Sequence, residues 1–161
     1  MHGLGGCWLN VGVGSSRVWL GEHTVNPARM GRETLRLVTV NCNGLRRRRR
    51  RLALGHLLAV LKVDICIITE SHLRKGDLKM LKGGDFPEYA VISSFCRKAK
   101  NRKIGGGVVI MAHTGLTVTK GEEGEGDGEP LEVCSIFLRP ERNESLRIRI
   151  TGVYVPPSRT G

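Results

Sequence analysis

The apolar positions along this chain follow two different periods, and the places where the period changes mark the predicted elements. Residues 35–40 form a short β-branched run that predicts a strand, and residues 41–44 (Asn-Cys-Asn-Gly) end it with residues that favour turns. Residues 54–61 carry leucines at helical spacing, which predicts a helix with one apolar face that ends at Lys62. Residues 63–69 are almost continuously apolar, which predicts a strand buried on both faces.

The second half of the chain predicts strands rather than helices. Short apolar or alternating runs predict strands at residues 89–95, 108–112, 116–119, 133–138 and 146–155. Residues 121–132 form a predicted loop that holds 6 of the 15 acidic residues. Glycines 105–107 predict a bend into the next strand, because no Gly-Lys-Ser/Thr sequence follows to make a phosphate loop. The order strand, helix, strand and then a run of strands fits an α+β fold or a layered α/β/α sheet.

Two parts of the chain differ in character. Residues 1–34 mix glycine, tryptophan and small polar residues without a sustained period, and we expect a poorly ordered leader there. Residues 35–161 hold all the predicted elements and form the expected domain. The whole chain has 161 residues and a mass of 17.7 kDa, which suits one domain.

The net charge of the chain indicates what kind of partner it binds. Lys and Arg number 26 against 15 Asp and Glu, so the formal net charge is +11 and the sequence pI is about 10.0. An excess of this size favours a polyanionic partner, either nucleic acid or an anionic lipid surface. No apolar stretch approaches the ~18 residues that span a bilayer, so no membrane protein is expected.

The five cysteines bear on the compartment. They are odd in number and widely spaced, and they contain no Cys-x-x-Cys pair, so neither a zinc knuckle nor a disulfide framework is predicted. Buried thiols in a reducing compartment are the favoured interpretation, which predicts a nuclear or cytoplasmic location. The N-terminus lacks the cationic region of a secretory signal, so secretion is not expected.

Polar side chains follow the first two predicted strands. Asn41 and Asn43 come at the end of the first strand, and Glu70 follows the second. If the helix between them is a crossover, the strands are parallel and these residues converge at one edge of the sheet. Carboxylate and amide oxygens suit Mg²⁺, which keeps several waters and bridges to phosphate. The alternative is that Asn43 only makes a turn and Glu70 only starts a helix.

An arginine run precedes the predicted helix. Six like charges repel one another and oppose the helix dipole, so we expect the run to fray in the free protein. One interpretation is a solvated basic segment or a nuclear-localisation-like signal; the other is contact with nucleic-acid phosphates. The candidate nucleic-acid-binding residues are Arg46, Arg47, Arg48, Arg49, Arg50 and Arg51.

Four segments together resemble a known superfamily. In order along the chain they are residues 37–45 (LVTVNCNGL), 64–73 (DICIITESHL), 105–110 (GGGVVI) and 152–157 (GVYVPP). The chain over residues 35–161 is similar to the N-terminal half of the endonuclease/exonuclease/phosphatase superfamily. It looks closest to the apurinic-type endonuclease domain of non-LTR retrotransposons.

The resemblance implies roles for matching residues. Asn41 and Asn43 resemble strand-end residues that help to hold the metal and the phosphate, and Glu70 resembles the main carboxylate ligand of the catalytic ion. The implied metal ligands are therefore Glu70 and Asn43, and the implied cofactor is Mg²⁺ (or Mn²⁺). Tyr154 resembles an active-site tyrosine near the scissile phosphate, where a phenol can donate a hydrogen bond. His72 is given a supporting role at most.

The resemblance also implies a fold and a reaction. The expected fold is part of a four-layered α/β/β/α sandwich (DNase I-like) whose C-terminal half is missing, because the family's Asp-x-Asn and Ser-Asp-His motifs do not occur here. The chain is then a fragment of a Mg²⁺-dependent endonuclease that nicks target DNA for reverse transcription, and we expect it to be inactive alone. Its partners would be DNA and the rest of a retroelement polyprotein, including the reverse transcriptase.

Two alternatives stay open at this point. The chain is either a non-catalytic basic fragment that binds nucleic acid, or part of a phosphatase of the same superfamily that acts on a phosphorylated lipid or sugar. Whether the chain is itself an enzyme is therefore left open by the sequence.

Overall fold

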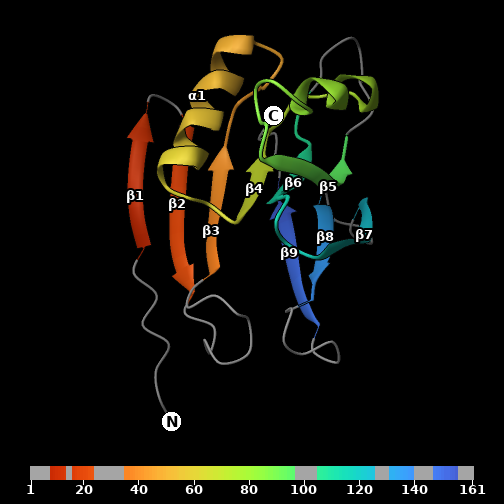
Figure 1. The fold of residues 1–161 in the computed structure, drawn as a ribbon. Coiled ribbons are helices and arrows are strands. Elements are labelled where there is room, and N and C mark those ends of the chain that lie inside the picture. The colour runs from red at the N-terminus through yellow and green to blue at the C-terminus, as the bar shows by residue number, and fades with distance from the viewer. Residues whose placement is uncertain are drawn as a thin grey trace.

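A computed structural model describes residues 8–13, 16–23, 35–96, 105–125, 131–139 and 147–155 of the chain. Its elements form a mixed α+β arrangement with two sheets, as the sequence predicted. The larger sheet has the strand order β1-β2-β3-β4-β6-β5 (Figure 1). Its strands are β1 (Trp8–Val13), β2 (Ser16–His23), β3 (Leu35–Asn41), β4 (Ile65–Thr69), β5 (Tyr89–Phe95) and β6 (Val108–His113).

The remaining described elements are one α-helix, one 3₁₀ helix and a second sheet. The helices are α1 (Arg48–Val60) and η2 (Lys75–Leu81). The second sheet is antiparallel, in the order β7-β8-β9, and consists of β7 (Val118–Glu125), β8 (Glu132–Leu138) and β9 (Ile148–Tyr154).

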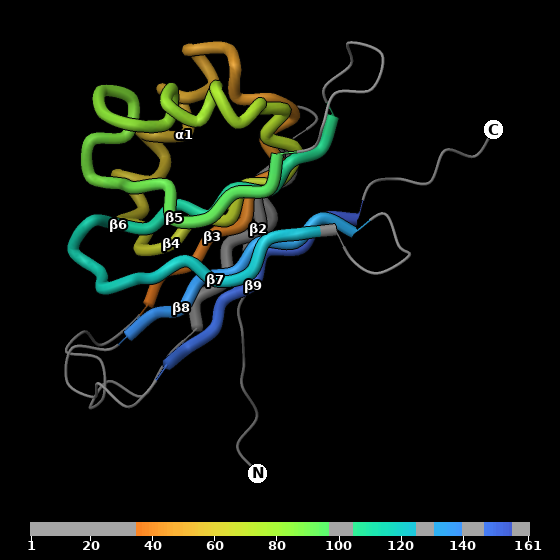
Figure 2. The backbone as a smooth tube through the Cα atoms, turned by 90° about the vertical axis from the view of Figure 1, so that its right-hand side faces the viewer, coloured from red at the N-terminus to blue at the C-terminus, as the bar shows by residue number. Residues whose placement is uncertain are grey.

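The elements stack in layers around the larger sheet. Figure 2 shows α1 and the neighbouring green segment on one side of the strands β3 to β6, and β7 to β9 on the other. The first apolar core lies between the helices and the sheet and includes Leu54, Leu58, Ile68 and Phe86. The second lies between the two sheets and includes Ile65, Ile110, Ile136 and Leu138. Burying apolar surface on both faces of one sheet is what holds the layers together.

The pair β3 and β4 positions the strand ends from which the site is built. The two strands are parallel, with Asn41 beside Thr69 in the register, and α1 forms the connection between them. All five residues of β4 are buried. Both findings confirm the predictions made from the apolar run and from the crossover rule.

Strands β1 and β2 lie within residues 1–34, where we expected a poorly ordered leader. They pair as an antiparallel hairpin, and β2 continues the sheet along the free edge of β3. A hairpin at a sheet edge is held by main-chain hydrogen bonds, so it can form without the sustained side-chain period that the prediction required. Residues 1–7, 14–15 and 24–34 lie outside the described residues.

Element boundaries also shift in the acidic segment. We predicted a loop over residues 121–132, but β7 continues to Glu125 and β8 already begins at Glu132. The ladder between β7 and β8 contains an irregularity between Lys120 and Glu123, where Ser135 Oγ accepts a 2.8 Å hydrogen bond from the N–H of Glu122. Pairing with β8 therefore overrides the unfavourable strand composition of this glycine- and acid-rich segment.

A search for membrane-crossing helices gives a negative result for the described residues, where no helix combines the length and the apolar character needed to cross a bilayer.

Candidate functional site

The loop after β3 lies directly against the segment after β4. Beyond the two strands, main-chain hydrogen bonds join Cys42 N to Thr69 O (3.1 Å), Gly44 N to Glu70 O (2.7 Å) and Leu45 N to Ser71 O (2.9 Å). The strand-end residues Asn41, Asn43 and Glu70 are therefore neighbours along one edge of the sheet, as the crossover argument predicted.

This loop has a defined turn conformation. Asn43 has φ 43° and Gly44 has φ 97°, and Asn41 Oδ1 accepts a 3.1 Å hydrogen bond from the N–H of Asn43. Asparagine and glycine are the residues that adopt left-handed φ most readily, so the sequence Asn-Gly fits the position. Asn41 thus acts on its own loop through its side-chain oxygen.

The guanidinium of Arg50 holds the same loop from the side of α1. Its Nη1 donates to the carbonyl oxygens of Cys42 (3.3 Å), Asn43 and Gly44 (3.2 Å). Three carbonyl oxygens that converge on one charged donor form charge-assisted hydrogen bonds, which are stronger than those of a neutral donor. Arg50 therefore fixes the position of Asn43 from within the arginine run.

Glu70 meets residues from two other parts of the chain. Tyr154, from β9, donates a 2.6 Å hydrogen bond from its hydroxyl to Glu70 Oε1 across a separation of 84 residues. The other carboxylate oxygen, Oε2, lies 4.0 Å from His72 Nε2, and the Glu70 side chain is 23% exposed. Glu70 (φ 49°) and His72 (φ 51°) both adopt left-handed backbone conformations. Such strain is kept only where the surroundings enforce it, and it gathers at functional sites.

Glycines 105–107 support this strained segment. The carbonyls of Gly107 and Gly106 accept hydrogen bonds from Ser71 N (3.1 Å) and His72 N (3.0 Å), respectively. The N–H of Gly107 donates to Glu132 Oε2, and Glu132 is fully buried. The glycine segment leads directly into β6, with positive φ at Gly106 and Gly107, and its carbonyls hold the backbone of Ser71 and His72.

The donors around Glu70 suit a hydrated divalent cation better than a tightly coordinated one. Within the described residues, no group of three or more His, Cys, Asp or Glu side chains gathers that could enclose a metal ion. Mg²⁺ commonly uses one or two carboxylates and completes its coordination with water and substrate phosphate. Glu70, with one oxygen toward Tyr154 and a partly exposed side chain, fits that requirement, and Asn43 lies on the adjacent loop.

The thiols near the site do not add metal ligands. Burial raises the pKa of the Cys42 thiol to about 12, although the nearby charge of Arg50 lowers it slightly, and burial raises the pKa of Cys66 as well. The thiolate is the form that binds metal, so these cysteines stay neutral core residues. Cys134 is also buried, which agrees with the interpretation of the cysteines as structural thiols.

The arginine run divides into side chains with different surroundings. We expected the run to fray, and this was wrong, because α1 already begins at Arg48. Arg51 is buried, with Nε donating to Asp85 Oδ2 (2.7 Å) and Nη1 donating to the carbonyls of Leu45 and Arg46. This pairing replaces the repulsion that the sequence alone suggests, and it makes Arg51 a structural residue rather than a surface contact.

The other arginines stay at the surface. Arg46 Nε lies 3.3 Å from Asp77 Oδ2, and Arg48 Nε lies 3.7 Å from Asp85 Oδ1 with its side chain 75% exposed. Arg47 and Arg49 are exposed as well. The run thus keeps a basic face next to the candidate metal site.

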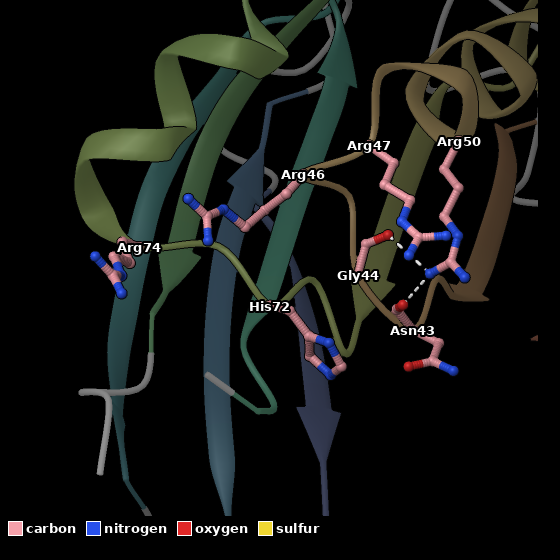
Figure 3. A pocket seen from close by; sticks show the side chains of 7 residues that line it. All are labelled: Asn43, Gly44, Arg46, Arg47, Arg50, His72 and Arg74. Carbon is pink, nitrogen blue, oxygen red and sulfur yellow. Dashed lines mark hydrogen bonds between the residues drawn. The ribbon is translucent and has the colours of Figure 1, made fainter. Parts of the chain in front are cut away.

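A pocket of about 370 Å³ opens where this basic face meets the Glu70 segment. Figure 3 shows Arg46 and Arg74 on one side and Arg47 and Arg50 on the other, with Gly44 and His72 between them. The residues that line it are Asn43, Gly44, Arg46, Arg47, Arg50, His72 and Arg74. The four guanidinium groups give this hollow a positive lining, which favours an anion over a cation.

Sequence reasoning placed some of these residues and missed others. It singled out Asn43, Glu70 and Tyr154, but it did not single out Arg74 or Glu132. For Glu132 no alternation in residues 132–138 indicated a buried position, and only the structure places it on the same face of β8 as the buried Cys134, Ile136 and Leu138. For Arg74 no local pattern existed, because its role depends on the arrangement of two distant segments.

No protein-family model matches the chain, and no curated protein matches its sequence.

Proposed function

We propose that this chain carries the N-terminal part of a Mg²⁺-dependent phosphodiesterase site of the retrotransposon endonuclease type, which acts on DNA. The observation that carries the proposal is the hydrogen bond of 2.6 Å between Tyr154 and Glu70. Both residues were selected from the sequence for the same site, although 84 residues separate them. A fold that brings two such residues into direct contact supports a shared role at one phosphate.

In this proposal each group has one task. Glu70, with Asn43 beside it, holds the divalent ion, which when bound polarises a phosphate oxygen and stabilises charge that develops during hydrolysis. The hydroxyl of Tyr154 orients the Glu70 carboxylate by donating its single proton to it, and it would have to release this bond in order to donate to a phosphate oxygen. Asn41 and Arg50 keep the Asn43 loop in position. Arg46 and Arg47, on the basic face, attract the DNA backbone.

The layer order supports the proposed fold. Helices cover one face of the larger sheet and β7 to β9 cover the other, which corresponds to three layers of an α/β/β/α sandwich. We propose that the DNase I-like sandwich is completed by a second half that carries the Asp-x-Asn and Ser-Asp-His motifs, which do not occur in these 161 residues. DNA and the remainder of a retroelement polyprotein with its reverse transcriptase are the proposed partners.

A second candidate function rests on the basic pocket. A pocket lined by four arginines, of which Arg47 and Arg74 form no ion pair among the described residues, is also suited to bind nucleic acid without cleaving it. In that case affinity for a duplex falls steeply with salt and does not depend on Glu70.

Metal binding tests the first proposal directly. Electron paramagnetic resonance of Mn²⁺ in the presence of a short duplex reports free ion, and we expect the chain to reduce that signal through Glu70. The variant Glu70→Gln removes the charge without changing the volume, so we expect at least a tenfold loss of Mn²⁺ affinity. Glu88→Gln is the matched control, because Glu88 is an exposed carboxylate away from this edge. Equal affinity of the wild type and Glu70→Gln would overturn the assignment of Glu70.

Plasmid nicking tests the expectation that the chain alone is inactive. With Mg²⁺ and supercoiled plasmid, we expect the chain alone to give no nicked product above a reaction without protein. Robust nicking that disappears in Glu70→Gln would contradict the expected inactivity while supporting the metal site. If the wild type and Glu70→Gln bind the duplex equally well and also bind Mn²⁺ equally, the non-catalytic binding function would be favoured.

A further inference from the structure

We propose that the arginine-lined pocket is a separate binding site for one backbone phosphate of nucleic acid, next to the phosphate that would lie at Glu70. This inference deepens the proposed function and rests on it for the position of the second phosphate. The site is made by two segments, since Arg46, Arg47 and Arg50 come from the start of α1 while His72 and Arg74 come from the segment after β4.

The charges of the pocket are not all available to a ligand. Arg50 Nη1 donates to the carbonyls of the Asn43 loop, and Arg46 Nε lies 3.3 Å from Asp77. Arg47 and Arg74, by contrast, form no ion pair among the described residues, and both are exposed at the pocket. Arg47 and Arg74 line the pocket from the two segments that form it (Figure 3), and their guanidinium groups are therefore the two that remain available to an anion.

The acids near the pocket leave its charge positive. Asp77 pairs with Arg46, and its Oδ2 also accepts a hydrogen bond from Arg74 N at 3.1 Å, so this carboxylate is already engaged. Glu70 lies at the border of the pocket, with Oε2 4.0 Å from His72 Nε2. Against these two acids stand the four lining arginines, so an anion is favoured over a cation in the hollow.

The backbone keeps the hollow open. Gly44 lines the pocket at φ 97°, and a Cβ there would lie 3.2 Å from His72 Nδ1 and 3.6 Å from Arg50 Nη1. A side chain at this position would therefore fill space between the two basic segments. The pocket has a volume of about 370 Å³, which is many times the ~30 Å³ that one water molecule occupies in the liquid. It therefore has room for a phosphate with part of its hydration shell.

The position of the pocket favours nucleic acid as the source of the phosphate. Because His72 lies between the arginines and Glu70, an anion in the pocket is adjacent to the candidate metal position. A polymer with regularly spaced phosphates can occupy both places at once, whereas a small phosphate occupies one. The formal net charge of +11 adds long-range attraction for the polymer.

Charge-matched variants test this inference with a fluorescent duplex that carries no terminal phosphate. We expect Arg47→Gln and Arg74→Gln each to weaken duplex binding at least fivefold near physiological salt. The controls Arg139→Gln and Lys75→Gln each remove one exposed positive charge outside the pocket, and we expect less than a twofold effect from each. In the double variant of Arg47 and Arg74, the fall of log K with log salt should also become less steep, with a slope smaller in magnitude by about 0.9, which corresponds to the loss of one phosphate contact.

Side-chain NMR identifies the source of the phosphate. Inorganic phosphate should shift the Nε–Hε signals of Arg47 and Arg74 at millimolar concentration, and the duplex should displace it. Saturation by inorganic phosphate without competition by the duplex would overturn the assignment to nucleic acid. Equal weakening by all four single variants would overturn the pocket and leave only diffuse attraction.

The two proposals can fail separately. If Mn²⁺ binding depends on Glu70 while all four charge variants behave alike, the pocket is wrong and the proposed function stands. If the Arg47 and Arg74 variants are selectively weak while Mn²⁺ binding is independent of Glu70, the pocket stands and the metal assignment is wrong. If the wild type binds no duplex, both the pocket and DNA as the partner are overturned.

Discussion

The buried carboxylate of Glu132 accepts a hydrogen bond from the backbone N–H of Gly107, and this bond ties the second sheet to the segment that carries His72. In the ladder between β8 and β9, Glu132 also lies directly opposite Tyr154. One residue of β8 therefore adjoins both the tyrosine that reaches Glu70 and the glycine segment beneath Ser71 and His72. The candidate site is built across the interface between the two sheets.

Gly107→Ala should destabilise the chain. Gly107 has φ 92°, and a Cβ there would lie 2.5 Å from Ser71 Oγ, which is buried, so both strain and a clash result. We expect a loss of about 2 kcal/mol in the free energy of unfolding, measured by urea denaturation. Gly105→Ala is the control in the same segment, because an added Cβ there meets no atom within 4 Å. A stability unchanged by Gly107→Ala would show that this segment tolerates a side chain.

Arg51→Met should cost far more stability than Arg48→Met. The Arg51 side chain is 10% exposed and pairs with Asp85 at 2.7 Å, whereas Arg48 is 75% exposed and lies 3.7 Å from the same carboxylate. Removing one partner of a buried pair leaves an uncompensated charge, which costs about 3 kcal/mol, while a surface pair contributes about 0–1 kcal/mol. Thermal or urea unfolding of both variants measures the difference. Equal losses would mean that Arg51 contributes only as one charge of the run.

Stability should fall with rising pH through the ionisation of buried thiols. Burial raises the pKa of Cys134 from 9.0 to about 11, so the folded protein keeps the proton after the unfolded chain has lost it. The stabilisation is complete below pH 9 and is lost as the pH rises from 9 to about 11. Cys134→Ala should therefore show a shallower fall than the wild type over this range. If the free energy of unfolding falls equally steeply with pH in the two proteins, the ionisation of Cys134 does not contribute to the fall.

Arg50→Gln should loosen the loop after β3 without unfolding the domain. Its Nη1 donates to the carbonyls of Cys42, Asn43 and Gly44, and no other described side chain donates to these three oxygens. We expect faster amide hydrogen exchange at Gly44 and Leu45 in this variant. Arg49→Gln, an exposed neighbour in the same helix, should leave the exchange rates at these amides close to wild type. Unchanged exchange in Arg50→Gln would show that the hydrogen bonds to Glu70 and Ser71 suffice to hold the loop.

Patterns that act within one element were predictable from the sequence. The continuous apolar run before Glu70 predicted a doubly buried strand, and the connecting helix predicted a parallel pair, because each follows from a local period or a general connection rule. The placement of Asn41 and Glu70 at one edge follows from those two predictions. The hairpin β1–β2 was missed because its pairing depends on the exposed backbone of β3 and not on side-chain period.

Contacts between segments that are distant in the sequence could not be predicted from local periods or connection rules. Nothing near Arg51 indicates that it pairs with Asp85, and the repulsion within the run suggested the opposite behaviour. The pocket likewise needs Arg74, which precedes a 3₁₀ helix that no periodicity predicted. The contact of Tyr154 with Glu70 was not predicted, because the family resemblance implied a role for each residue separately and strand patterns say nothing about which residues of two sheets meet.

The wide separation of Tyr154 and Glu70 along the chain has a consequence for folding order. The β3–α1–β4 unit closes through a short connection, whereas the bond to Tyr154 requires a loop of 84 residues to close and the second sheet to dock. Because the entropy cost of loop closure grows with loop length, we expect the site to be completed after its first half has assembled. A chain arrested at the earlier stage would hold the Asn43 loop beside Glu70 but lack the tyrosine, so the Tyr154–Glu70 bond would serve as a late marker of the folded state.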